Sequence, residues 1–148
     1  MITLGLDLGD KRVGVAISDP NGIMAVPVKP IELKSASGSK AAADELINAV
    51  GKVALEQRAE KIVVGLPISM SGNVSEQTKK VKRLCDQMSK AFPIPVVTWD
   101  ERLSTSEADR ALAEAGITSK MRRNKLDSSA AAIILQGYLD SQRKISQP

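Results

Sequence analysis

Hydrophobic residues alternate with small or polar residues near the start of the chain. The alternation runs through residues 2–7 and again through residues 13–17, with Gly9 and Asp10 between the two runs. Alternation of this kind predicts two strands, and a glycine–aspartate pair between them favours a hairpin. Residues 24–33 form a third strand-like segment that carries two prolines. Because proline cannot donate a hydrogen bond to a neighbouring strand, we expect this segment at an edge of the sheet.

Strand-like and helix-like segments alternate through the rest of the chain. Continuous apolar runs at residues 61–67 and 96–99 predict two more strands, the first of them buried at the centre of the sheet. Apolar residues at helical spacing predict helices over residues 41–58, 73–91, 104–115 and 127–143. A hairpin followed by strand–helix alternation indicates an α/β fold with a mixed sheet. Within that sheet, we expect residues 2–7, 62–66 and 96–99 to be neighbouring central strands.

Two of the predicted helices begin at a capping pattern. Asn73 is followed three residues later by Glu76, and Ser104 is followed in the same way by Glu107. In such a pattern, the two side chains bind backbone N–H groups that the first helical turn leaves without a partner. The sequence therefore predicts that Asn73 and Ser104 are the N-caps of their helices.

The composition is that of one globular domain of 148 residues, with 43% hydrophobic and 26% charged residues. We place the domain at residues 1–143 and a frayed tail at residues 144–148. Aromatic residues make up only 2%, so the core must be aliphatic. For the same reason, gripping single-stranded nucleic acid by base stacking is largely excluded. A net charge of +4 is compatible with a polyanionic partner.

Cysteine count and hydropathy bear on the location of the protein. The single cysteine excludes an internal disulfide, which fits a reducing cytoplasm. The N-terminus shows no basic segment followed by an apolar stretch, and no apolar run approaches the ~18 residues that a membrane helix needs. We therefore expect a cytoplasmic protein that does not enter a membrane.

Histidine is absent from the sequence, and this narrows the possible chemistry. An imidazole general base and a nucleophile–histidine pair are both excluded. A zinc site would have only one cysteine and carboxylates to draw on, which is a poor ligand set for zinc. An enzyme with this composition must use carboxylates, lysines or a metal ion held by oxygen ligands.

Acidic residues stand at the ends of three predicted elements. Asp7 follows the first strand, Asp100 and Glu101 follow the last, and Asp127 opens the final helix. Ligands of α/β sheets gather at the carboxyl ends of strands, so these side chains can converge. Converging carboxylates need a cation, and Mg²⁺ takes carboxylate and phosphate oxygens as ligands. Two such ions about 3.5–4 Å apart promote phosphodiester cleavage without histidine.

Each of these acidic residues also has a purely structural explanation. Asp7 can stabilise the hairpin turn that follows it, and Asp127 can act as the N-cap of its helix. Asp100 and Glu101 can be solvated residues of a turn. Spacing alone does not decide between the structural and the functional interpretation.

The segment before the last predicted helix is basic. Residues 117–126 carry four positive side chains, those of Lys120, Arg122, Arg123 and Lys125. Such a loop next to Asp127 is suited to contact the phosphates of a nucleic acid. The alternative is a solvated charged surface, which is what most charge runs are.

Four stretches of sequence carry a resemblance to a known family. They are Gly-Leu-Asp-Leu-Gly-Asp-Lys-Arg-Val-Gly-Val-Ala-Ile-Ser-Asp at residues 5–19, Val-Val-Gly-Leu-Pro at 63–67, Asp-Glu-Arg-Leu-Ser-Thr-Ser at 100–106 and Leu-Asp-Ser-Ser-Ala-Ala-Ala-Ile-Ile-Leu-Gln at 126–136. In this order, they resemble the motifs of the YqgF-type family of Holliday junction resolvases. Four ordered motifs across most of the chain are far more specific than any one of them.

The resemblance implies a fold and a site. It implies a ribonuclease H-like α/β fold, in which a five-stranded mixed sheet has helices on both faces. It implies a nuclease whose metal-binding carboxylates are Asp7, Glu101 and Asp127, with Mg²⁺ or Mn²⁺ as the cofactor. Family members are linked to resolving four-way DNA junctions and to trimming the 5′ end of precursor 16S ribosomal RNA. We assign nucleic-acid contact to the basic residues of the motifs and the basic loop, namely Lys11, Arg12, Arg102, Lys120, Arg122, Arg123 and Lys125.

Other interpretations lead to different expectations. A phosphotransferase or ATPase of the actin-like superfamily opens with a similar strand–Asp–Gly hairpin, but encloses its nucleotide between two such domains, and tight ATP binding would favour it. A non-catalytic factor that binds nucleic acid or assists ribosome assembly would use only the basic loop and would bind without metal. Resolving a symmetric junction calls for two active sites and so for a homodimer, whereas trimming RNA ends does not.

Overall fold

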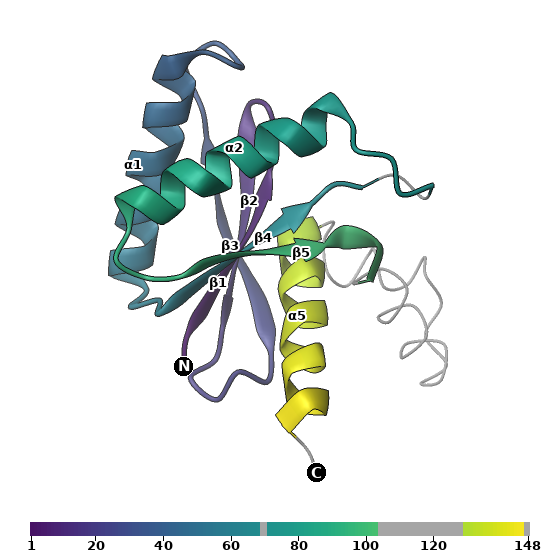
Figure 1. Ribbon diagram of the computed structural model, residues 1–148. Coiled ribbons are helices and arrows are strands. Elements are labelled where there is room, and N and C mark those ends of the chain that lie inside the picture. Colours follow the sequence, from purple (N-terminus) through teal and green to yellow (C-terminus); the bar gives the residue numbers. More distant parts are fainter. Residues whose placement is uncertain (69–70, 104–128, 147–148) are drawn as a thin grey trace.

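The computed structural model describes residues 1–68, 71–103 and 129–146, and the side chains of these residues as far as Arg143. Five strands form one sheet, flanked by helices (Figure 1). The strands are β1 Thr3–Leu8, β2 Arg12–Ser18, β3 Ala25–Glu32, β4 Lys61–Leu66 and β5 Val96–Asp100. The described helices are α1 Lys40–Glu56, α2 Glu76–Ala91 and α5 Ala130–Ser146. The helix expected over 104–115 lies outside the described residues.

The sheet is mixed, with the strand order β3-β2-β1-β4-β5. β1 and β2 form the expected antiparallel hairpin, and β3 continues it in the antiparallel sense. β1, β4 and β5 run parallel to one another. The carboxyl ends of these three strands therefore meet at one side of the sheet, which is where ligands bind in folds of this kind.

The positions of two strands test the expectations from the sequence. β3, with Pro27 and Pro30, lies at one edge of the sheet, as predicted. β5 is a neighbour of β4 but lies at the other edge of the described sheet, so the expectation of a central strand was wrong for it. Thr98 of β5 is exposed, and the two valines before it are only partly buried. An apolar run shows that helices cover a strand, but it does not show whether a strand pairs on both sides.

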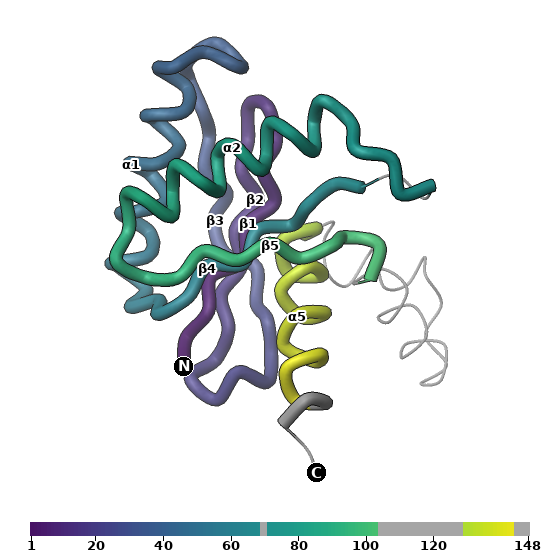
Figure 2. The backbone as a smooth tube through the Cα atoms, viewed as in Figure 1, coloured from purple at the N-terminus to yellow at the C-terminus, as the bar shows by residue number. Residues whose placement is uncertain are grey.

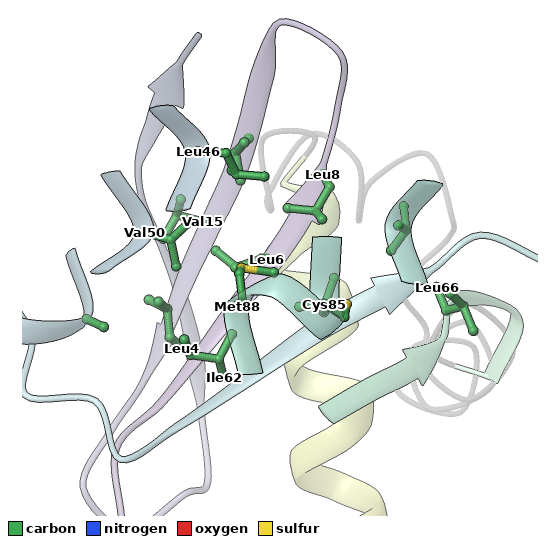
Figure 3. Packing of buried hydrophobic residues seen from close by; sticks show 14 residues of the cluster. Leu4, Leu6, Leu8, Val15, Leu46, Val50, Ile62, Leu66, Cys85 and Met88 are labelled. Carbon is green, nitrogen blue, oxygen red and sulfur yellow. The ribbon is translucent and has the colours of Figure 1, made fainter. Parts of the chain in front are cut away.

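One face of the sheet carries the main hydrophobic core, beneath α1 and α2 (Figures 1 and 2). Leu4, Leu6 and Leu8 of β1 point into this core, where they meet Val50 of α1 and Met88 of α2 (Figure 3). The core is aliphatic, as the composition required. Since side chains alternate along a strand, Gly5 and Asp7 of β1 face the opposite side of the sheet.

The opposite face is covered by α5, which lies close to the strands because glycines line its path. A Cβ atom at Gly5 would stand 2.7 Å from Cβ of Leu135, and one at Gly14 would stand 3.5 Å from Cβ of Ala131. Farther along α5, Tyr138 accepts a 2.9 Å hydrogen bond from Lys61 and packs edge-to-face on Trp99. The glycines thus bring the first turns of α5 down onto β1 and β2, on the face that carries Asp7.

Hydroxyl side chains cap the helices, and one cap differs from its predicted position. Ser39 caps α1 by accepting a hydrogen bond from the N–H of Ala42. In α2 the N-cap is Ser75, which forms a capping box with Thr78, and not the predicted Asn73 with Glu76. Thr78 is fully buried, and its hydroxyl also donates to the carbonyl of Pro67. This link to the end of β4 fixes the helix start two residues later than local sequence preference suggested.

The last helix also differs in its bounds. α5 begins at Ala130 and continues to Ser146, whereas the sequence predicted a helix over 127–143. Ser129 caps the helix, because its Oγ accepts from the N–H of Ala132 at 3.1 Å and its carbonyl accepts from the N–H of Ile133 at 3.2 Å. Among the described residues, no helix combines the length and the apolar character needed to cross a membrane.

Candidate active site

Asp7 and Glu101 come together at the carboxyl side of the sheet, although 94 positions separate them in the sequence. Asp7 stands one residue before the end of β1, opposite Gly14 of β2. Glu101 directly follows β5, and β4 lies between these two strands. The two carboxyl groups are within hydrogen-bonding range of each other. The structure therefore joins two of the three carboxylates that the sequence singled out.

The environment of the pair opposes two negative charges. Burial raises the pKa of Asp7, and the hydrogen bond with Glu101 only partly offsets this effect. Burial is also the main cause that raises the pKa of Glu101, and the nearby charges of Asp7 and Asp100 raise it further. The hydrogen bond favours a protonated Glu101 that donates to an ionised Asp7. Two carboxylate charges are therefore disfavoured at this place, and a bound cation would offset that cost.

Gly65 of β4 provides the space in which the two carboxyl groups meet. It lies on the same face of the sheet as Asp7, because Val64 and Leu66 on either side of it point into the opposite core. A Cβ atom at Gly65 would stand 2.9 Å from Oε1 of Glu101. The Glu101 side chain thus reaches back across the bare backbone of β4 toward Asp7.

Asp100 has a different role from its neighbour. Its carboxylate accepts hydrogen bonds from Arg102, at 2.9 Å from the backbone N–H, 3.1 Å from Nε and 2.7 Å from Nη2. The Arg102 guanidinium holds the pKa of Asp100 below its usual value. The structure therefore separates the two acidic residues that the sequence could not distinguish, because Glu101 meets Asp7 while Asp100 binds Arg102.

The basic residues assigned to nucleic-acid contact differ in what they touch. Arg12 is exposed and forms a 2.7 Å ion pair with Glu32 of β3. Lys11 is exposed at the hairpin turn, and among the described residues no ion pair engages it. Arg102 is bound to Asp100, and its Nη1 would stand 4.0 Å from a Cβ atom at Gly72 in the loop after β4. Of these three, Lys11 is the most available for a phosphate.

Five of the predicted site residues lie outside the described residues, namely Asp127, Lys120, Arg122, Arg123 and Lys125. Among the residues that are described, no group of three or more acidic, histidine or cysteine side chains is gathered in the way a metal ion requires. One result nevertheless bears on Asp127. The sequence suggested that Asp127 could be the N-cap of the last helix. In the structure, Ser129 is the N-cap of α5, so this structural explanation for Asp127 does not hold.

A cavity of about 470 Å³ lies elsewhere, on the face covered by α1 and α2. Its walls include Gly9 and Asp10 of the hairpin turn, and Asp10 there forms a 2.9 Å ion pair with Lys80 of α2. Neither Asp7 nor Glu101 lines this cavity. We place the candidate site at the carboxylate pair and not in the cavity. The pair lies at the carboxyl ends of the parallel strands, where ligands bind in such sheets, and burial raises the pKa of both of its members.

Sequence reasoning missed Gly65 and Ser129. Gly65 stands inside an apolar strand where most residues are large, and glycine within a strand often marks the close approach of another group. Ser129 belongs to a Ser-Ser pair after Asp127, and either serine is a suitable N-cap. Both signals are present in the sequence, but only the structure shows what they serve.

The fold and the site together define a class of protein. A five-stranded mixed sheet of this order, with helices on both faces and carboxyl groups at the ends of parallel strands, is ribonuclease H-like. The chain is similar over 97% of its length to RuvC of Thermus thermophilus bound to a Holliday junction substrate, with a TM-score of 0.63, 17% identity and 96% of that chain covered. This likeness confirms the predicted fold.

The family is shown by sequence. The family model RuvX, described as Holliday junction resolvase, matches residues 1–141, so the chain belongs to the RuvX family. A relative from Clostridium novyi is 41% identical over 95% of this chain and 99% of its own length, and its name presents it as a candidate pre-16S rRNA nuclease. A relative from Thermoanaerobacter pseudethanolicus with the same name is 42% identical over 97% of this chain and 99% of its own. The resemblance to the YqgF-type family is confirmed.

A weaker likeness concerns the alternative interpretation as a phosphotransferase. The ROK hexokinase of Thermus thermophilus matches 82% of this chain at a TM-score of 0.50 and 21% identity, but only 39% of the hexokinase chain is covered. The likeness shows a shared fold and leaves more than half of the kinase without a counterpart. It therefore gives no support to a phosphotransferase activity.

Proposed function

We propose that this nuclease of the RuvX family hydrolyses phosphodiester bonds with Mg²⁺ or Mn²⁺ held by Asp7, Glu101 and Asp127. The observation that carries the proposal is the convergence of two partly buried carboxyl groups, from β1 and from the end of β5, on one side of the sheet. A structural role for this pair is a poor explanation, because burial opposes the charge on both groups. A divalent cation would compensate the charge that the fold brings together.

The donor set fits such an ion. Mg²⁺ and Mn²⁺ take hard oxygen ligands, and the pair supplies carboxylate oxygens with no sulfur or imidazole among the donors. When bound, an ion of this kind would polarise the phosphoryl group and stabilise the negative charge on the attacking and the leaving oxygen atoms. The chain itself supplies the two carboxyl groups from the end of β1 and from the residue after β5, while Arg102 engages the neighbouring carboxylate of Asp100.

Support for Asp127 as a third ligand comes from the start of α5. Ala131 in its first turn packs over Gly14, whose own neighbour across the hairpin is Asp7. Ser129, the cap, follows Asp127 by two positions, and two residues of chain span at most about 7 Å. This short separation along the chain, from a helix start that packs near Asp7, supports Asp127 as the third ligand.

For the substrate, we propose the 5′ end of precursor 16S ribosomal RNA, in the cytoplasm. Relatives that are 41% and 42% identical over nearly the whole chain carry names that present them as candidate pre-16S rRNA nucleases. Four-way junction DNA is the second candidate, because the family model is described by it. The two substrates differ in what they demand of assembly, since a symmetric junction calls for a homodimer and an RNA end is within the reach of a monomer.

We propose further that the positive side chains near the site hold the nucleic-acid backbone. Lys11 and Arg102 flank the carboxylate pair in the sequence motifs, and the basic loop at 120–125 precedes Asp127 directly. Arg12 and Arg102 contribute less than Lys11, because Glu32 and Asp100 already neutralise them. Such contacts fix the register of the phosphate that is cut without reading sequence.

The experiment that tests this function is a cleavage assay on both substrates in parallel, with Mg²⁺, with Mn²⁺ and with a chelator. The proposal predicts that precursor 16S RNA is cut at its 5′ end only when the metal is present. Preferential cleavage of junction DNA would move the assignment to the second substrate. Metal-independent binding of RNA with no cleavage of either substrate would instead identify a non-catalytic assembly factor.

A further inference from the structure

We propose that Gly65 is a positioning residue for catalysis, because its missing side chain is the space through which the Glu101 carboxylate reaches Asp7. The inference rests on the proposed function only for the role of the pair in holding a metal ion. Its geometric part, the dependence of the Glu101 position on a bare backbone at Gly65, stands on the structure alone.

The geometry follows from the strand order. β4 separates β1 from β5, so a side chain from the end of β5 must cross β4 to meet Asp7. Gly65 pairs with Trp99 in the ladder between β4 and β5, and Glu101 lies two residues beyond Trp99, where the chain leaves β5 and turns helical. A Cβ atom at Gly65 would stand only 2.9 Å from Oε1 of Glu101, closer than carbon and oxygen can approach without repulsion.

Conformational freedom is not the reason for this glycine. Gly65 belongs to a regular strand and is absent from the described glycines with positive φ, which are Gly22, Gly38 and Gly72. Alanine would fit the backbone at this position, and a glycine within a strand lowers its stability. Space is therefore what glycine provides here.

Ile134 is a second close neighbour of Gly65, so that Gly65→Ala alone would disturb α5 as well as Glu101. Combining it with a substitution at Ile134 separates the two effects. The same Cβ atom would stand 2.4 Å from Cδ1 of Ile134 in α5. Cδ1 is the tip of a side chain, and Ile134→Val removes it while leaving the rest of the residue in place. The double variant Gly65→Ala/Ile134→Val thus removes the 2.4 Å clash with α5 and keeps the clash with Glu101. The next contact with Ile134 is that of Cγ1 at 3.1 Å, which a small shift of the side chain relieves.

The experiment compares four proteins: the wild type, Gly65→Ala, Ile134→Val and the double variant. Mg²⁺ affinity is measured by calorimetry, and kcat and KM are measured for cleavage. Ile134→Val should behave almost as the wild type. The double variant should stay folded but melt below Ile134→Val, because the clash with Glu101 remains. It should bind Mg²⁺ about 10–100-fold more weakly and lose a similar factor in kcat, with KM for the nucleic acid within about twofold.

A metal-free measurement separates the geometry from the function. In the presence of chelator, the decrease in melting temperature that Gly65→Ala causes in the Ile134→Val background is measured with and without Glu101→Ala. The decrease should be smaller with Glu101→Ala, because the new methyl group then occupies the space that the Glu101 side chain has left. An unchanged decrease with Glu101→Ala would overturn the proposal, and so would wild-type Mg²⁺ affinity in the double variant. Coupling between Gly65 and Glu101 without any Mg²⁺ binding by the wild type would uphold the geometric part and overturn the proposed function instead.

Discussion

The fold brings together two carboxyl groups that repel each other when both are ionised. In the metal-free protein, burial makes the charge on Asp7 and on Glu101 more costly, and the charge of Asp7 further disfavours ionisation of Glu101. Such an arrangement is typical of functional sites, where a bound ligand compensates the charge repulsion that the protein itself leaves in place. Both the activity and the pH dependence of stability should therefore respond to changes in this pair.

Replacing Asp7 by asparagine should abolish cleavage while the fold remains. A neutral amide is a poor ligand for Mg²⁺, so the rate should fall by about 100-fold or more, whereas binding of nucleic acid should largely persist. Without metal, thermal stability should hold or rise, because one of two clustered acidic groups is gone. Cleavage assays and thermal melting in chelator measure both effects. Asp10→Asn, an exposed neighbour paired with Lys80, is the matched control and should keep cleavage.

The stability of the metal-free protein should depend on pH through the same pair. Both folded pKa values lie above the ordinary values of 3.8 for Asp7 and 4.5 for Glu101. The contribution of the pair is therefore fully present below those values and is lost as the pH rises through the raised pKa values. Carboxylates with a lowered pKa, such as Asp100, have the opposite effect, because their contribution to stability is lost as the pH falls. The melting temperature of the wild type relative to Asp7→Asn, measured in chelator from about pH 4 to 7, should consequently decrease. A difference that does not change with pH would contradict raised pKa values for the pair.

Among the elements, α5 covers the face of the sheet that carries Asp7. Gly5 and Gly14 let its first turns approach β1 and β2, but their surroundings differ. A Cβ atom at Gly5 would meet Cβ of Leu135 at 2.7 Å and the carbonyl oxygen of Ala131 at 3.2 Å. At Gly14 the nearest atoms are 3.5 Å away, which is ordinary contact.

Gly5→Ala should therefore destabilise the protein by about 1–3 kcal/mol, because it forces α5 away from the sheet. Gly14→Ala should cost clearly less. Urea unfolding followed by circular dichroism gives both values. Equal losses in the two variants would show that the closeness of α5 to β1 does not limit the packing of this face.

Much of this arrangement could be predicted from the sequence. The hairpin, the edge position of β3 and the place of Asp7 follow from alternation, prolines and a strand-end carboxylate among glycines. The choice of Glu101 over Asp100 could not be derived from alternation, because neighbouring residues point to opposite faces and no local signal says which face is the site. The structure separates them through Arg102, which binds Asp100.

Other features depend on contacts that are distant in the sequence. β5 was expected to be central, but an apolar run does not show whether a strand pairs on both sides. The cap of α2 moved to Ser75 because Thr78 also binds Pro67 at the end of β4. Gly65 could not be assigned a role because the side chain that crosses it comes from another strand.

Across the whole molecule, a net charge of +4 suits a polyanionic substrate, and the proposed contacts should be visible in salt dependence. Replacing Arg122 and Arg123 together by alanine should weaken binding to all sequences alike. It should also flatten the plot of log affinity against log salt by about one unit for each phosphate that is no longer bound. Arg12→Ala, whose side chain is already paired with Glu32, is the control and should change the slope less. An unchanged slope in the double variant would identify the loop as a solvated charged surface.

The most direct test of the proposed active site is the position of the metal ion. Crystals of the protein soaked in Mn²⁺ and measured at the manganese absorption edge should show an anomalous peak in contact with carboxylate oxygens of both Asp7 and Glu101, beside Gly65. The same peak should vanish in Asp7→Asn. A protein that cleaves RNA with Mn²⁺ yet binds the ion away from this pair would contradict the assignment of the active site.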